Sequence, residues 1–182
     1  MLLPAKHNAT YQDVLDAPEG VRAELIGTDL YLQPRPRVSH QLALANLREE
    51  LVRGGQQAGS RWVLLPEVEL HIPFTLVPDL VGWRRERVTE PLDAPYFTVT
   101  PDWVCEVLSP SARAYDRGLK AKMYLEAGVR HLWFVDPEER ILEALTAIAD
   151  AWLLRGVYVG DEISVAPPFE GLSIALGRLW TA

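Results

Sequence analysis

Three apolar segments rich in Val and Trp constrain the fold of this chain more than any other feature. They are "RWVLLPEVELHIP" (61–73), "LVPDLVGW" (76–83) and "DWVCEVLS" (102–109), and charged or proline-containing connections separate them. Short apolar runs bounded by turn residues and enriched in β-branched and aromatic residues are typical of buried strands. We therefore predict three neighbouring strands of one central sheet.

The flanking segments predict helices and further strands around this sheet. The predicted helices are a short one near the capping pair Thr10 and Asp13, a long one from the N-cap Ser39 to Gly54-Gly55, and one over 112–127. The further strands are a hairpin over 21–36 that turns at 27–29, a strand over 129–139, and a pair within 140–164 joined at 149–150. Together they indicate a single α/β (α+β) domain over 1–182, with a mixed sheet flanked by helices.

Composition limits the cellular compartment and the kinds of partner that we expect. The single cysteine, Cys105, lies in an apolar strand and excludes an intramolecular disulfide, which favours a reducing compartment and a structural thiol. No run of 18 apolar residues is present, so we expect a cytoplasmic protein and no membrane span. The net charge of −7 argues mildly against nonspecific binding to polyanions. Basic residues nevertheless cluster locally over 35–37, 84–87 and 113–122, although each cluster is also compatible with a solvated surface.

Two lone acids in apolar strands are the candidate functional residues. Glu106 stands in the middle of the third apolar segment, and Asp79 is similarly placed in the second. A buried carboxylate needs compensation from a basic side chain, from backbone N–H groups or from a metal ion. If the strands pair, both acids project from one sheet face, where a divalent ion that prefers oxygen ligands would relieve their repulsion. Mg²⁺ or Mn²⁺ fits such a site, and it would activate a water molecule and neutralise charge on a phosphoryl group.

A lysine close to the two acids would support this chemistry. On the helix over 112–127, at about 100° per residue, Lys120 lies nearer than Lys122 to the apolar stripe, so Lys120 is better aimed at the sheet. Asp116 precedes Lys120 by four residues. An ordinary surface ion pair between these two residues is the alternative interpretation, and spacing alone favours it.

These residues carry a family resemblance that covers nearly the whole chain. Asp79, Glu106 in "EVLSPS", the segment "DRGLKAKMY" with Asp116, Lys120 and Tyr124, and "AGVRHLWFVDP" follow one another in this order. The pattern resembles the Uma-two domain family, which is grouped with restriction endonucleases in the PD-(D/E)XK nuclease superfamily. The superfamily's E-x-K tripeptide is Glu-Val-Leu here, and the family pattern places the lysine on the following helix. The resemblance thus implies a restriction-endonuclease-like fold with Asp79, Glu106 and Lys120 in the site.

The resemblance also extends to "RAELIGTDLYLQPRPRVSH", where Glu24 and His40 match family positions. Glu24 has an alternative interpretation as a surface acid, and only the resemblance favours it as a third catalytic carboxylate. His40 lies on an apolar helix face and is by default a histidine at the edge of the core. Tyr124 would contact a phosphate or pack, and packing is favoured.

The leading hypothesis is a Mg²⁺-dependent endonuclease that hydrolyses DNA phosphodiester bonds. Its metal ligands are Asp79 and Glu106, Glu24 is an auxiliary acid, and Lys120 acts on the attacking water. The second hypothesis is a nuclease-fold protein that binds nucleic acid or a protein partner without cutting. A glycoside hydrolase lacks supporting clusters of aromatic residues. We also expect a homodimer, with an interface in the tryptophan-rich carboxyl-terminal half.

Overall fold

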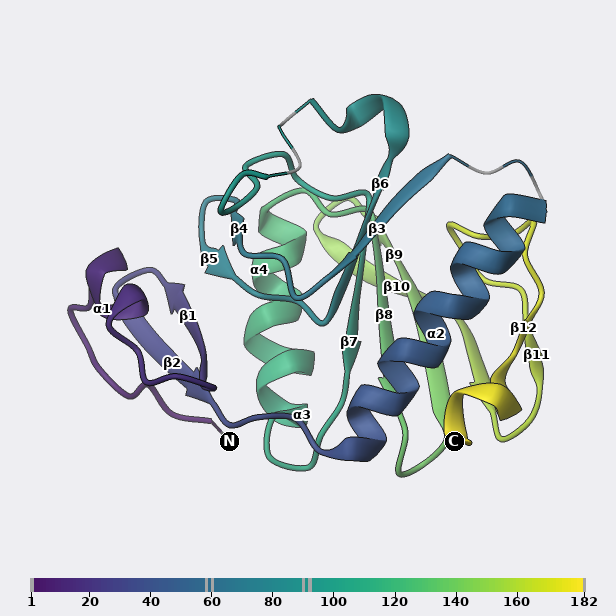
Figure 1. The fold of residues 1–182 in the computed structure, drawn as a ribbon, viewed down its shortest axis with the longest axis horizontal. Helices are drawn as coiled ribbons and strands as arrows, with labels where there is room; N and C mark the ends of the chain where they lie inside the picture. The colour runs from purple at the N-terminus through teal and green to yellow at the C-terminus, as the bar shows by residue number, and fades with distance from the viewer. Residues whose placement is uncertain (1, 58, 60, 90, 92, 182) are drawn as a thin grey trace.

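The computed structural model describes residues 2–57, 59, 61–89, 91 and 93–181, which form a large six-stranded sheet, a smaller four-stranded sheet, a two-stranded sheet and the helices around them (Figure 1). The large sheet has the strand order β10-β9-β8-β7-β6-β3. Its strands are β3 (Trp62–Pro66), β6 (Leu80–Arg84), β7 (Trp103–Val107), β8 (His131–Asp136), β9 (Ile141–Ile148) and β10 (Ala151–Val159). β7 and β8 pair in parallel, and the other pairs are antiparallel. The predicted mixed sheet and the adjacency of its three apolar strands are confirmed.

Helices lie on both sides of the large sheet (Figure 1). Helix α2 (Val38–Gln57) packs on one face; the other face is covered by one continuous helix of three parts, α3 (Arg113–Tyr115), the π-helical turn η2 (Asp116–Lys120) and α4 (Ala121–Glu126). Side chains alternate along β7, so Trp103 and Cys105 pack on the α2 side while Val104 packs on the other side. The interior of the sheet is therefore apolar on both faces, which makes any acid there conspicuous.

The amino-terminal part forms the smaller sheet beside the large one. Its order is β2-β1-β5-β4, with β1 (Arg22–Ile26), β2 (Asp29–Gln33), β4 (Leu70–His71) and β5 (Thr75–Leu76). The predicted hairpin is confirmed as β1 and β2, and the predicted short helix is α1 (Tyr11–Leu15), which has its capping box. The remaining elements are η1 (Arg85–Arg87), β11 (Ile163–Ser164), β12 (Ile174–Ala175) and η3 (Leu176–Trp180). No helix in the described part of the chain is long and apolar enough to span a membrane.

The predicted strands over 61–73 and 76–83 are each divided between the two sheets. The first segment leaves the large sheet after β3, because Glu67 adopts φ 49° and redirects the chain toward β4. The N–H of Glu67 donates to the carbonyl of Asp79 at 3.1 Å, and this bond fixes the crossing point of the two segments. Asp79 consequently lies in the connection between β5 and β6 rather than inside a strand.

The predicted limits of the long helix are also wrong. α2 begins at Val38, so Ser39 is helical, and the helix continues through Gly54 and Gly55. Gly54 faces Leu172 of the carboxyl-terminal segment, whose side chain would lie 3.4 Å from an added Cβ. This tertiary packing outweighs the low helix propensity of glycine.

Candidate active site

Asp79 and Glu106 lie opposite each other at one end of β6 and β7. Leu80, the first residue of β6, pairs with Cys105 of β7, so Asp79 just before β6 lies beside the end of β7 that carries Glu106. Glu106 contacts Lys120 and Tyr124 of the helix on one face, whereas the side-chain partners of Asp79 are His40 of α2 and Arg22 of β1. Both acids are almost fully buried, at 2% and 1% exposed. The predicted pairing of the two strands is confirmed, and the shared face and the catalytic role of the acids stay predictions.

Asp79 is surrounded by hydrogen-bond donors and one guanidinium. Its Oδ2 accepts the N–H of Val107 at 2.7 Å and lies 3.1 Å from Nε2 of His40. Its Oδ1 lies 2.8 Å from Nη2 of Arg22. Burial raises the pKa of this carboxyl, but Arg22 and His40 outweigh burial and bring the pKa well below its usual range. Asp79 is thus ionised, and the expected core-edge histidine, His40, is its partner.

Glu106 is paired with Lys120, the lysine that helical geometry favoured. Nζ of Lys120 lies 2.6 Å from Oε1 of Glu106, which also accepts a hydrogen bond from the hydroxyl of Tyr124. Burial raises the pKa of Glu106 to about 7, an effect that Lys120 opposes and Asp79 adds to. Burial lowers the pKa of Lys120, but Glu106 and Glu24 outweigh it and raise that pKa above its usual value. Tyr124 therefore both packs in the core and bonds an acid of the site.

Glu24 is fully buried, so its interpretation as a surface acid is wrong. Its side chain reaches from the smaller sheet to Nζ of Lys120 at 3.0 Å. Its oxygens also accept hydrogen bonds from Gln33 Nε2 at 2.7 Å, Val77 N–H at 2.8 Å and the Tyr115 hydroxyl at 3.0 Å. Glu24 thereby fixes Lys120 between two carboxylates.

The alternative of an Asp116–Lys120 surface pair is also wrong, because both residues are buried in the π-helical turn. Within the described residues, Asp116 forms no ion pair with Lys120. Burial and the nearby Glu106 raise the pKa of Asp116 well above its usual value. Lys122, in contrast, is exposed and pairs with Glu126 at 3.6 Å, so it points away from the acids as expected.

Arg22 is a site residue that the sequence reasoning missed. Its Nη2 bridges Asp79 and Glu67, at 2.8 Å and 2.7 Å. Arg22 precedes Glu24 by two residues in β1, and the period of two along a strand places both side chains on one face. That alternation is the signal that identifies Arg22 once Glu24 is assigned to the site.

The donor set fits a divalent cation held by two carboxylates. The described residues hold no group of three or more His, Cys, Asp or Glu side chains arranged for a metal. Mg²⁺ requires only one or two carboxylates when water and substrate complete its shell. Oδ1 of Asp79 is buried and, despite its ion pair with Arg22, accepts no hydrogen bond in the described structure. This oxygen and the carboxylate of Glu106 are the ligands available to such an ion.

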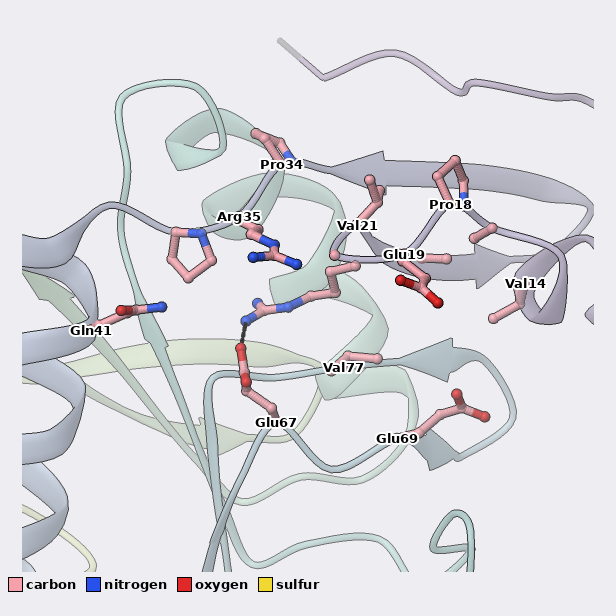
Figure 2. Close-up of a pocket in the computed structure, with 15 residues that line it drawn as sticks. Val14, Pro18, Glu19, Val21, Pro34, Arg35, Gln41, Glu67, Glu69 and Val77 are labelled. Carbon is pink, nitrogen blue, oxygen red and sulfur yellow. Dashed lines mark hydrogen bonds and ion pairs between the residues drawn. The ribbon is translucent and has the colours of Figure 1, made fainter.

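A cavity of about 610 Å³ adjoins the acid cluster. Figure 2 shows Arg35 pointing into it above the dashed bond at Glu67, whose donor is Arg22. The hairpin supplies Arg22 and Arg35, α2 supplies Gln41, and the connection before β4 supplies Glu67. Arg22 lines this cavity and pairs with Asp79, so its side chain separates the cavity from the buried acids.

Comparisons with known proteins give the family and a similar solved structure. The model of the Uma2 family, described as "Putative restriction endonuclease", matches residues 9–177. A solved structure from Anabaena variabilis, titled a "putative nuclease belonging to DUF820", matches with a TM-score of 0.72 at 19% identity. That match covers 94% of this chain and 97% of the other. No curated protein matches the sequence.

Proposed function

Because the chain belongs to the Uma2 family of putative restriction endonucleases, we propose that it is a metal-dependent endonuclease that hydrolyses DNA phosphodiester bonds. The observation that carries this proposal is the burial of Asp79, Glu106 and Lys120 close together where β6 begins beside β7. Two carboxylates and an ammonium at one point supply the charges that phosphodiester hydrolysis with a divalent ion requires.

Each residue has a defined part in this proposal. Asp79 and Glu106 would hold Mg²⁺ or Mn²⁺, which when bound supplies an activated water and neutralises charge on the phosphoryl group. The raised pKa of Lys120 keeps it an ammonium, so it would stabilise negative charge rather than accept a proton. Glu24 would position Lys120.

The test is plasmid cleavage with Mn²⁺, with Mg²⁺ and with a chelator. We expect the wild type to cut with either metal and to stop with chelator, and we expect Asp79→Ala and Glu106→Ala, purified identically, to be inactive. The matched control is Glu126→Ala, which removes an exposed acid that pairs with Lys122 on α4. This variant should cut like the wild type. Equal cleavage by all four proteins would indicate a contaminating nuclease and refute the assignment.

The second candidate is a nuclease-fold protein that binds nucleic acid or a partner without cutting. One observation favours it: each acid already has an organic cation, Arg22 at Asp79 and Lys120 at Glu106. Oligonucleotide binding measured by fluorescence anisotropy, together with no cleavage under either metal, would support this candidate over the first.

A cytoplasmic homodimer remains part of the proposal. The expected interface in the tryptophan-rich carboxyl-terminal half stays a prediction; Trp133 is fully buried there, and Trp152 and Trp180 are partly exposed. Exposed apolar side chains lie on β10, an edge strand of the large sheet, at Leu154 and Val157 among others. The interface that we propose within this half is therefore β10.

A further inference from the structure

We propose that Arg22 changes partners during function: it neutralises Asp79 in the metal-free protein and turns into the adjoining cavity to bind a substrate phosphate, with Arg35, when a divalent cation takes its place. This inference rests on the proposed function and deepens it by assigning a phosphate subsite to the cavity.

The contacts of Arg22 in the described part of the chain show that it forms an ion pair with Asp79 but no hydrogen bond to it. Its Nη2 lies 2.8 Å from Oδ1 of Asp79 but donates its hydrogen bond to Glu67 at 2.7 Å. Oδ1 accepts no hydrogen bond in the described structure. If the guanidinium left, Asp79 would lose a neighbouring positive charge but no hydrogen bond. A cation bound to the same oxygen would replace that positive charge.

The position of Arg22 allows the exchange. Its side chain is 14% exposed, while that of Asp79 is 2% exposed, so Arg22 lies between the buried acids and solvent. Arg22 also lines the cavity. The side chain of Glu67 accepts a hydrogen bond from Arg22. The backbone of Glu67 adopts φ 49°, which is uncommon for glutamate and occurs at functional sites more often than elsewhere.

Arg35 gives the cavity a free cation. Among the described residues it forms no ion pair, and its guanidinium points into the cavity (Figure 2). Gly20, at φ 75°, makes room for it, because an added Cβ would lie 2.3 Å from Nε of Arg35. Of the cavity's carboxylates, Glu67 is paired with Arg22, and Glu69 accepts bonds from Tyr11 and His71.

The carboxylate of Glu19, which forms no ion pair among the described residues, also lines the cavity. Three described glutamates and two described arginines therefore surround the cavity, and Arg35 is the arginine without an ion pair there. Guanidinium groups recognise phosphate through paired N–H donors. A phosphate that binds Arg22 and Arg35 would free Asp79 for the metal, and a metal at Asp79 would free Arg22 for the phosphate. By linkage, each ligand must then strengthen the binding of the other.

The experiment is calorimetric titration of Mn²⁺ into the wild type, Arg22→Gln, Arg22→Lys and Arg35→Gln. A separate arm measures the anisotropy of a labelled, nuclease-resistant eight-nucleotide dT strand with Mn²⁺, the state in which Arg22 is free to bind phosphate, and again with chelator. Arg22→Gln should bind Mn²⁺ about tenfold more tightly, because the competing charge is gone, and should bind the strand about tenfold more weakly. Arg35→Gln should lose strand affinity similarly and keep Mn²⁺ affinity within about twofold.

The lysine variant and one added control, Arg37→Gln, make the result decisive. Arg22→Lys, whose compact ammonium lacks the guanidinium fork, should bind Mn²⁺ more tightly than the wild type and less tightly than the glutamine variant, so it tests the exchange even if Arg22→Gln does not fold. Arg37→Gln removes an exposed arginine that pairs with Glu138, and it should match the wild type in both assays.

Mn²⁺ affinity that is unchanged or weaker in the folded Arg22 variants would overturn the inference while the wild type still binds Mn²⁺ and cuts. A wild type that neither binds Mn²⁺ nor cuts would instead overturn the proposed function, and the inference with it.

Discussion

Replacing Lys120 with alanine is expected to destabilise the protein strongly, because its ammonium neutralises two buried carboxylates. Nζ lies 2.6 Å from Glu106 and 3.0 Å from Glu24, and the side chain is fully buried. It also donates to the carbonyl of Val77 at 3.3 Å. Removing one partner of a buried pair costs about 3–5 kcal/mol, since the other charge stays buried without compensation. Two carboxylates lose their partner here, so we expect the free energy of unfolding to fall by at least about 3 kcal/mol.

Lys122→Ala is the matched control on the same helix. Its Nζ lies 3.6 Å from Glu126, and both side chains are largely exposed. Exposed pairs of this spacing contribute about 0.3–0.5 kcal/mol. Urea denaturation followed by tryptophan fluorescence, with chelator at pH 8, should therefore separate the two variants clearly.

The decrease in the free energy of unfolding caused by Lys120→Ala should also depend on pH. A carboxyl whose folded pKa is raised contributes stability below its unfolded value, near 4.5, and that stability is lost as pH rises through the folded value, about 7 for Glu106. Without the opposing charge of Lys120 the folded pKa rises further, so the loss continues above pH 7. The gap between Lys120→Ala and the wild type should widen from pH 6 to pH 8. A Lys120→Ala variant as stable as Lys122→Ala at pH 8 would refute the argument.

Three further predictions concern chemistry, reactivity and assembly. Lys120→Gln should slow single-turnover DNA cleavage with Mn²⁺ by about 10²-fold or more while Lys122→Gln leaves the rate unchanged; equal losses would show that the wrong lysine is assigned. Because burial raises the pKa of the Cys105 thiol, a thiol reagent should label Cys105 only in denaturant, and rapid labelling of the native protein would contradict its burial. Light scattering at micromolar concentration should give twice the 20.4 kDa chain mass, and replacing Leu154 with Lys should yield a monomer; a wild-type monomer would count against the β10 interface.

The paired acids could be predicted because their signal is local. A lone carboxylate among apolar residues is visible in the sequence at Asp79 and at Glu106, and two such residues on neighbouring strands must be compensated together. Helical geometry then separated Lys120 from Lys122. Even so, that geometry placed Lys120 at the border of the apolar stripe, whereas the structure buries it completely.

Arg22 could be identified only through its strand neighbour Glu24, and Glu67 could not be predicted, because their roles arise where the two sheets meet. Arg22 lies on β1 of the smaller sheet, and its partner Asp79 precedes β6 of the large one. Nothing in the sequence near Glu67 indicates that its backbone takes φ 49° and divides a continuous apolar run between two sheets. The Arg22–Glu67 contact joins segments 45 residues apart in sequence, and such a contact leaves no local pattern at Glu67.

The position of Lys120 depends on the number of residues in the π-helical turn from Asp116 to Lys120. A π turn closes hydrogen bonds over five residues instead of four, so it accommodates one more residue than an α-helical turn. Deleting Gly118, where nothing lies within 4 Å of an added Cβ, would let the turn close as an ordinary α-helical turn, with the helix before and after it in the same phase. Tyr115, before the turn, would stay at Glu24, whereas Lys120, which the turn contains, would be displaced from Glu106. The extra residue of the π turn is therefore what places the ammonium, and the helix should fold without it while the site loses its lysine.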